Sequence, residues 1–211
     1  MLRHLLMPVS RHTRMLALAL AAAAACVLAA TASSRPRNLP PGPWCGGRLW
    51  RMMTLSDPMR QTVDLHGDPT TIADIAKLDS PSRTLQTRST QFQRHVWRMR
   101  TVIDRYRVAS NGEIVLILFS IDSAQYMNAY LPNPHCLGPD SRDRTGMISA
   151  RKQLTARCAR VTPAWQLVGL TVDIGGVGFW NPNRSTRGAL PNGAELRPVT
   201  NLKIVNGCGI G

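Results

Sequence analysis

Acidic residues are scarce in this chain of 211 residues, which has 12 aspartates and glutamates against 26 lysines and arginines. Four of these carboxylates are candidate metal ligands, but they are isolated in the sequence: Asp104, Glu113, Asp122 and Glu195. A metal-dependent nuclease needs several carboxylates around its metal ion. The sequence therefore gives little support to that class of hydrolase unless the fold gathers these side chains.

Other catalytic motifs are also missing. No G-x-S-x-G elbow offers a serine nucleophile, and no C-x-x-C pair or close pair of histidines offers a zinc site. Gly176 and Gly178 lack the third glycine and the helix of a dinucleotide-binding loop, so a bulge or a tight turn is the better interpretation. We therefore expect no catalytic residues, no metal and no cofactor, and favour a non-catalytic role over an enzymatic one.

Only one long apolar run occurs, from Met15 to Ala30, and it follows a segment with three arginines. This order, followed by the pattern Ala30-Thr31-Ala32, is typical of a secretory signal peptide cleaved after Ala32. An uncleaved anchor is disfavoured because a bilayer span needs about 18 to 20 apolar residues, and no second candidate lies downstream. The alternative is a lipoprotein anchored at Cys26.

The rest of the chain predicts one basic domain that is secreted or periplasmic. Residues 33–43 form a proline-rich linker, and residues 44–211 suffice for a single domain with a core. Removing residues 1–32 removes three arginines and no acidic residue, so the formal charge falls from +14 to +11. The four remaining cysteines predict two disulfides with all three pairings open. They are Cys45, Cys136, Cys158 and Cys208.

Hydrophobic periodicity predicts short helical structure at residues 70–78 and a longer helix at 143–159. Strands are expected at residues 91–104, 113–121, 125–131, 168–174 and 195–205. In the last strand one face would carry Arg197, Val199, Asn201 and Lys203, and Pro198 implies an edge or a bulge. This is the layout of a mainly β (α+β) protein, an OB-like five-stranded barrel with a helix between strands 3 and 4 and a short N-terminal helical segment. Another α+β sheet is the alternative.

Arginines and aromatic residues fall where an OB barrel meets polyanions. The arginines are Arg98 and Arg100 on the first strand, Arg105 and Arg107 in the expected loop after it, Arg184 and Arg187 in the loop before the last strand, and Arg197 on the last strand. The aromatic residues are Tyr126, Tyr130 and Trp180, on which bases could stack. These ten are the candidate binding residues.

Three functions follow from these patterns. The leading hypothesis is a binding module for an anionic polymer or surface, such as single-stranded nucleic acid or an anionic envelope component. The alternative is a structural or protein-interaction module of the envelope, in which the aromatic residues belong to the core and the charge is incidental. The third is a nuclease-like hydrolase that would depend on Glu113 or Glu195.

The C-terminal third carries a longer motif, DIGGVGFWNPNRSTRGALPNGAELRPV at residues 173–199. It resembles the signature VTGVGFFDFxHGQTGVAPNGIELHPV of a family of small secreted bacterial proteins without an established function. Segments matching that family in order are WRMMTLSD at 50–57, residues 70–78, NGEIVLIL at 111–118 and LPNPHC at 131–136. The resemblance implies an OB-like barrel and an extracytoplasmic location, and it says little about activity.

The chain departs from that signature at three positions of chemical interest. Arg184 and Arg197 stand where the family has histidines, and Thr186 stands where it has glutamine. Any acid–base or metal chemistry of those histidines would therefore be missing here.

The resemblance also bears on the disulfides. Cys45 and Cys136 match cysteines of the family, whereas Cys158 and Cys208 are additional. The resemblance therefore implies that each set pairs with itself.

Overall fold

The structure, a computed structural model, describes residues 45, 47, 49–158 and 160–208. The chain divides into two units, residues 1–40 and 41–211, and every described residue belongs to the second. The expected signal peptide, the linker and Cys26 lie outside the described residues. Within the described ranges, no helix is long and apolar enough to cross a membrane.

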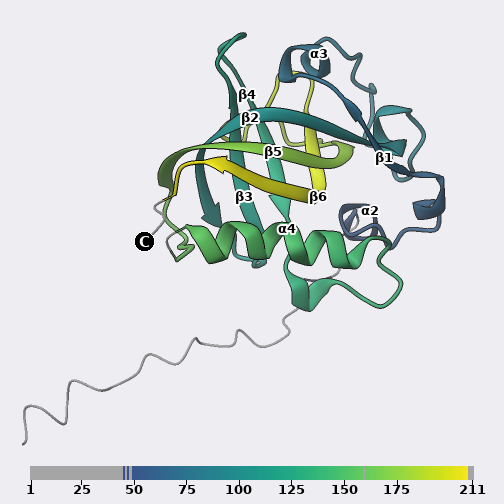
Figure 1. Ribbon diagram of the computed structural model, residues 1–211. Helices are drawn as coiled ribbons and strands as arrows, with labels where there is room; N and C mark the ends of the chain where they lie inside the picture. Colours follow the sequence, from purple (N-terminus) through teal and green to yellow (C-terminus); the bar gives the residue numbers. More distant parts are fainter. Residues whose placement is uncertain (1–44, 46, 48, 159, 209–211) are drawn as a thin grey trace, which may run out of the picture. The chain divides into compact units, whose positions relative to one another are not determined.

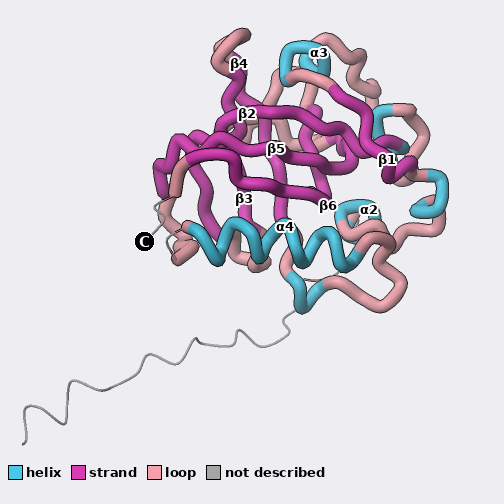
Figure 2. Tube along the Cα trace, in the orientation of Figure 1, coloured by secondary structure: helices cyan, strands magenta, loops and turns pink. Residues whose placement is uncertain are grey.

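A sheet of six strands forms the centre of this described part (Figures 1 and 2). The strands are β1 (Asp64–Pro69), β2 (His95–Val108), β3 (Ile114–Ser120), β4 (Gln125–Leu131), β5 (Gln166–Trp180) and β6 (Ala194–Asn206). They pair in the order β1-β2-β3-β4-β6-β5, and β5 pairs with β2 as well. The pairs β1–β2 and β4–β6 are parallel, and the other pairs are antiparallel.

Short helices connect the strands, and one longer helix packs beside β6 (Figure 1). The helices are α2 (Trp50–Met53), η2 (Arg60–Thr62), α3 (Ile72–Ala76), η3 (Phe92–Arg94), η4 (Pro134–Cys136) and α4 (Arg144–Arg157). Side chains cap the N-termini of α3 and α4, because Thr71 accepts a hydrogen bond from the Asp74 amide and Asp143 accepts one from the Gly146 amide. The helix α4 buries Met147, Ala150 and Leu154.

The mainly β architecture and both expected helical segments are confirmed. The count of five strands is wrong, because β1 adds a sixth, and α4 therefore lies between β4 and β5. The sequence of β1, DLHGDP, shows no apolar alternation and contains glycine and proline. Tertiary contacts hold it instead: it pairs with β2, and Arg98 Nε donates to the Gly67 carbonyl at 2.8 Å.

The expected start and end of the first strand are also corrected. Gln91 to Arg94 form a turn with η3, and β2 continues to Val108, so Arg105 and Arg107 lie within the strand and not in a loop. A register irregularity between Ile103 and Arg105 explains why the sequence pattern ends the strand too early. Ile103 and Tyr106 are both fully buried although they are three residues apart, so simple alternation fails there.

Pro198 lies at a bulge in β6; of the two alternatives that this proline implied, an edge or a bulge, the structure shows the bulge. The register of β6 against β5 shifts between Gly175 and Gly176 and again between Gly176 and Gly178. As a result Val199 enters the core, whereas Arg197 joins a polar cluster and Asn201 is exposed. The expectation that these three side chains share one face is therefore wrong.

The glycines of the GVGF segment lie at these bulges, as expected. Gly178 has a further reason to lack a side chain, because a Cβ there would lie 2.1 Å from the Phe92 carbonyl oxygen. The backbone of η3 therefore packs directly against β5 at this point.

Two disulfides join the cysteines in the pairing that the resemblance implied. Cys45 pairs with Cys136, and Cys158 pairs with Cys208. The second bridge joins the end of α4 to the residues just after β6, so it closes the segment between Cys158 and Cys208 into a covalent loop.

Candidate functional site

One pocket brings together three of the ten candidate residues from three separate segments. Arg105 comes from β2, Tyr126 from β4 and Arg187 from the β5–β6 loop. Asp104, Ile117 and Gly188 complete a lining around about 220 Å³. We call this the hairpin pocket because it lies beside the β3–β4 hairpin, whose turn projects beyond the neighbouring strands (Figure 1).

The hairpin supplies an aromatic surface to this pocket. Tyr126 is 42% exposed, and its ring lies 4.8 Å from the ring of its cross-strand partner Phe119. Arg105 is held by an ion pair from Nε to Asp104 Oδ2 at 2.5 Å, and both side chains are a quarter exposed. An exposed ring next to guanidinium groups suits a ligand that has both a flat face and negative charge.

Arg187 is exposed and belongs to the β5–β6 loop, which is held against the sheet. Asn128 of β4 donates from Nδ2 to Thr186 Oγ1 at 3.1 Å. Gly188 has a φ of +78°, and a Cβ there would lie 2.7 Å from Asn128 Oδ1 and 2.8 Å from Ile117. Only glycine allows the loop to approach the sheet this closely, which sets the position of the neighbouring guanidinium.

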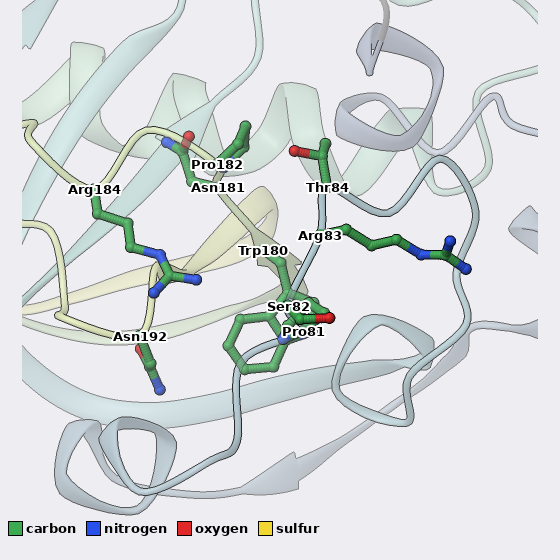
Figure 3. A pocket seen from close by; sticks show the side chains of 9 residues that line it. All are labelled: Pro81, Ser82, Arg83, Thr84, Trp180, Asn181, Pro182, Arg184 and Asn192. Atoms are coloured by element: carbon green, nitrogen blue, oxygen red, sulfur yellow. The ribbon is translucent and has the colours of Figure 1, made fainter.

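A second pocket is lined by residues from both ends of the same loop and contains two more candidates, Trp180 and Arg184. We call it the tryptophan pocket. Its other lining residues are Pro81, Ser82, Arg83, Thr84, Asn181, Pro182 and Asn192. Figure 3 shows Arg184 extending toward Asn192, whereas Arg83 extends away from it. Trp180 is largely buried, and its Nε1 donates to Thr90 Oγ1 at 3.0 Å.

Tyr130 and Arg197 lie in a buried cluster with the two glutamates that the sequence left isolated. Arg197 Nε donates to Glu113 Oε1 at 3.2 Å, and a second bond joins Nη2 to Glu113 Oε2. The guanidinium also lies 3.5 Å from Glu195 and stacks over the Tyr130 ring at 4.1 Å. Asn181 at the start of the β5–β6 loop donates to Glu195 Oε2 at 2.9 Å.

Burial dominates the electrostatics of this cluster. It raises the pKa of Glu195 to about 7, an effect that Glu113 reinforces and that Arg197 and Asn181 oppose. Burial likewise raises the pKa of Tyr130. The fold thus gathers two of the four isolated carboxylates, but among the described residues no group of three or more His, Cys, Asp or Glu could hold a metal ion.

The remaining candidates lie apart from both pockets. Arg98 and Arg100 line a third hollow, where Arg98 bonds the Gly67 carbonyl and Arg100 forms a double hydrogen bond with Asp173. Arg107 lies over the ring of Trp165 at 4.8 Å. Internal contacts alone do not set these three guanidinium groups apart, because Arg105 pairs with Asp104, and Arg184 donates to the Pro191 carbonyl at 3.4 Å and to Ser80 Oγ at 3.2 Å. The three differ in that they line neither of the two pockets.

No pattern in the sequence indicates that Asn128 and Asn181 hold the β5–β6 loop in place. Each fixes the β5–β6 loop through a single contact with a residue 58 or 14 positions away. Thr186 stood out only as a departure from the signature, and its bond to Asn128 supplies a structural role. Asparagines are frequent in turns, so no local pattern distinguishes a long-range anchor from an ordinary turn residue.

No protein-family profile matches this sequence, and no curated protein does either. Among solved structures, the chain is similar to the asparaginyl-tRNA synthetase of Entamoeba histolytica in complex with asparaginyl-adenylate, with a TM-score of 0.38 and 13% identity over 69% of this chain. Another structure of that enzyme gives a TM-score of 0.37 and 15% identity, again over 69% of this chain. The likeness spans 25% and 24% of the two synthetase chains. At these TM-scores it supports no conclusion about function.

Proposed function

We propose that this protein is a secreted or periplasmic module with an OB-like barrel, which binds an anionic polymer at the hairpin pocket without turning it over. The observation that carries the proposal is the meeting of Arg105, Tyr126 and Arg187 in that pocket. Two guanidinium groups offer phosphate or carboxylate recognition, and the exposed ring offers stacking.

The pairing of the strands supports the barrel. From β2 the pairs run through β3, β4, β6 and β5 and return to β2, with α4 between β4 and β5. This order agrees with the five strands and the helix expected of an OB-fold, to which β1 is an addition. Export is supported by the two disulfides, which persist in oxidising compartments.

Fluorescence anisotropy of a labelled single-stranded oligonucleotide, measured at increasing salt, tests the proposal. We expect binding that weakens steeply between about 50 and about 200 mM salt. Arg187→Ala should weaken it about tenfold, because a charge-assisted hydrogen bond is lost. Arg51→Ala removes the same charge from an exposed position on α2 and serves as the matched control. Absence of binding at low salt would refute the proposal.

A protein-interaction module of the envelope is the second candidate, and burial favours it. Tyr130 and Trp180 are 7% and 6% exposed and pack inside the protein, whereas Ile121 at the β3–β4 turn is 73% exposed. An affinity purification from the native envelope checks it: one stoichiometric partner, retained at high salt and lost with Ile121→Asp, would support this candidate over polymer binding.

A further inference from the structure

The β5–β6 loop, residues 181–193, connects the two pockets. Arg184 belongs to the tryptophan pocket and Arg187 to the hairpin pocket. They are three positions apart in the sequence, so their Cα atoms lie at most about 11 Å apart even if the backbone were fully extended. One ligand of modest length can therefore contact both pockets.

The loop holds the two pockets in a fixed relation. At its start Asn181 bonds Glu195, in its middle Thr186 bonds Asn128, and at its end Asn192 Nδ2 donates to the carbonyls of α3 and the residues after it. The distances from Asn192 are 2.9 Å to Ile75, 3.3 Å to Ala76 and 3.1 Å to Leu78. A ligand that binds both pockets therefore loses little free energy in ordering the loop.

The path across the loop is cationic and has apolar walls. Residues 181–193 contain two arginines and no acidic residue. The tryptophan pocket has two arginines, no carboxylate, and the flat side chains of Pro81, Trp180 and Pro182. Each pocket thus combines a guanidinium with apolar or aromatic surface, which matches the phosphate and the base of a nucleotide better than a polyanion without rings.

Building on the proposed function, we infer that one single-stranded nucleic acid crosses the β5–β6 loop and occupies both pockets at once. Arg187 and Tyr126 bind one nucleotide in the hairpin pocket, and Arg184 binds another in the tryptophan pocket. The ligand is then an oligonucleotide, because a mononucleotide is too short to occupy both pockets. Linking the two contacts raises affinity by about 10² or more over a mononucleotide.

The experiment compares an oligothymidylate of about ten nucleotides, within the site size of OB folds, with thymidine monophosphate. We expect Arg184→Ala to weaken the long ligand about tenfold and to reduce its salt slope by about 0.7, with no effect on the mononucleotide in the hairpin pocket. Arg187→Ala should weaken both ligands, and Arg51→Ala should weaken neither. Unchanged thermal unfolding of the variants excludes a folding defect, since Arg184 and Arg187 are exposed.

The outcomes separate this inference from the proposed function. If Arg187→Ala weakens the long ligand and Arg184→Ala does not, the hairpin pocket binds alone and the inference is wrong. If polyphosphate competes as strongly as the oligonucleotide at equal charge, base recognition is absent and the inference is also wrong. If neither ligand binds the unaltered protein at low salt, the proposed function itself fails.

Discussion

At the scale of single residues, the structure directs many arginines to internal carbonyl groups and so keeps them from the surface. Arg142 Nη1 donates to the carbonyls of Arg60 and Val63 at 2.7 and 2.6 Å, and Arg151 Nη1 donates to those of Leu131 and Pro132 at 3.2 and 3.1 Å. Burial lowers the pKa of Arg151 to about 10. A high net charge in the sequence therefore overstates the charge available to a ligand.

Glu195 should make the stability of the protein depend on pH. Its pKa rises from the ordinary value of 4.5 to about 7 on folding, so the folded state holds its proton more tightly than the unfolded state. Its contribution is fully present below about pH 4.5 and is lost as the pH rises to about 7. Urea unfolding at several pH values should show Glu195→Gln gaining stability relative to the unaltered protein across this window. Parallel pH curves would contradict the assignment.

Arg88 should be among the most sensitive positions for stability. Its side chain has no exposed surface: Nε and Nη2 bond Asp57 Oδ2 at 3.0 and 2.9 Å, and further bonds reach the carbonyls of Met52 and Gln93. Arg88→Met leaves Asp57 as a buried unpaired charge and should cost about 3 to 5 kcal/mol in urea unfolding. The double variant Arg88→Met with Asp57→Leu should recover part of this loss, and equal losses would contradict the explanation.

At the scale of elements, the β5–β6 loop decides which candidate residues meet. It lies against β3 and β4 through Gly188, and it reaches α3 through Asn192. The loop has a defined shape because long-range hydrogen bonds fix its start, middle and end. The site thus depends on a loop whose own sequence contains only turn-type residues.

Gly188→Ala should disturb both stability and binding. A Cβ at this position meets Asn128 and Ile117 at less than 3 Å, so the loop must shift and Arg187 must move with it. We expect a loss of at least about 1 to 2 kcal/mol from the positive φ alone, together with weaker oligonucleotide binding. Gly169→Ala is the matched control, because Gly169 also has a positive φ, +57°, but has no atom within 4 Å of the added Cβ. Equal effects of the two substitutions on binding would contradict the role of the close approach.

At the scale of the whole molecule, two disulfides link segments distant in the sequence. Their cysteines are 91 and 50 positions apart. Cys158–Cys208 joins the end of α4 to the end of β6 and so encloses β5, the β5–β6 loop and β6. The bridge thereby limits how far the unfolded chain can extend in the region that carries both pockets.

Replacing Cys158 and Cys208 together by serine should reduce the free energy of unfolding by about 4 kcal/mol, the loop-closure value for a loop of this length. Urea unfolding without reductant measures the loss. Oligonucleotide binding below the unfolding transition should persist, because neither cysteine of the bridge lines either pocket. An unchanged free energy of unfolding would contradict this loop-closure account of the bridge.

The sequence by itself determined the local features of this protein. A run that is apolar on both faces located β3, which is buried on both faces, and a shorter run ending before Pro132 located β4. The helix α4 was likewise visible from its periodicity, and Pro198 indicated an edge or a bulge in β6. These features depend on residues only a few positions apart.

Only the tertiary structure decided what depends on distant partners. The strand β1 has no hydrophobic pattern of its own. Alternation fails at the register irregularity between Ile103 and Arg105, so the sequence predicts a loop at Arg105, which in the structure lies in β2. The meeting of Arg105, Tyr126 and Arg187, and that of Glu113, Glu195 and Arg197, join segments far apart in the chain. Periodicity specifies which face of a strand is buried, whereas pairing and register specify which side chains become neighbours, and those follow from packing of the whole chain.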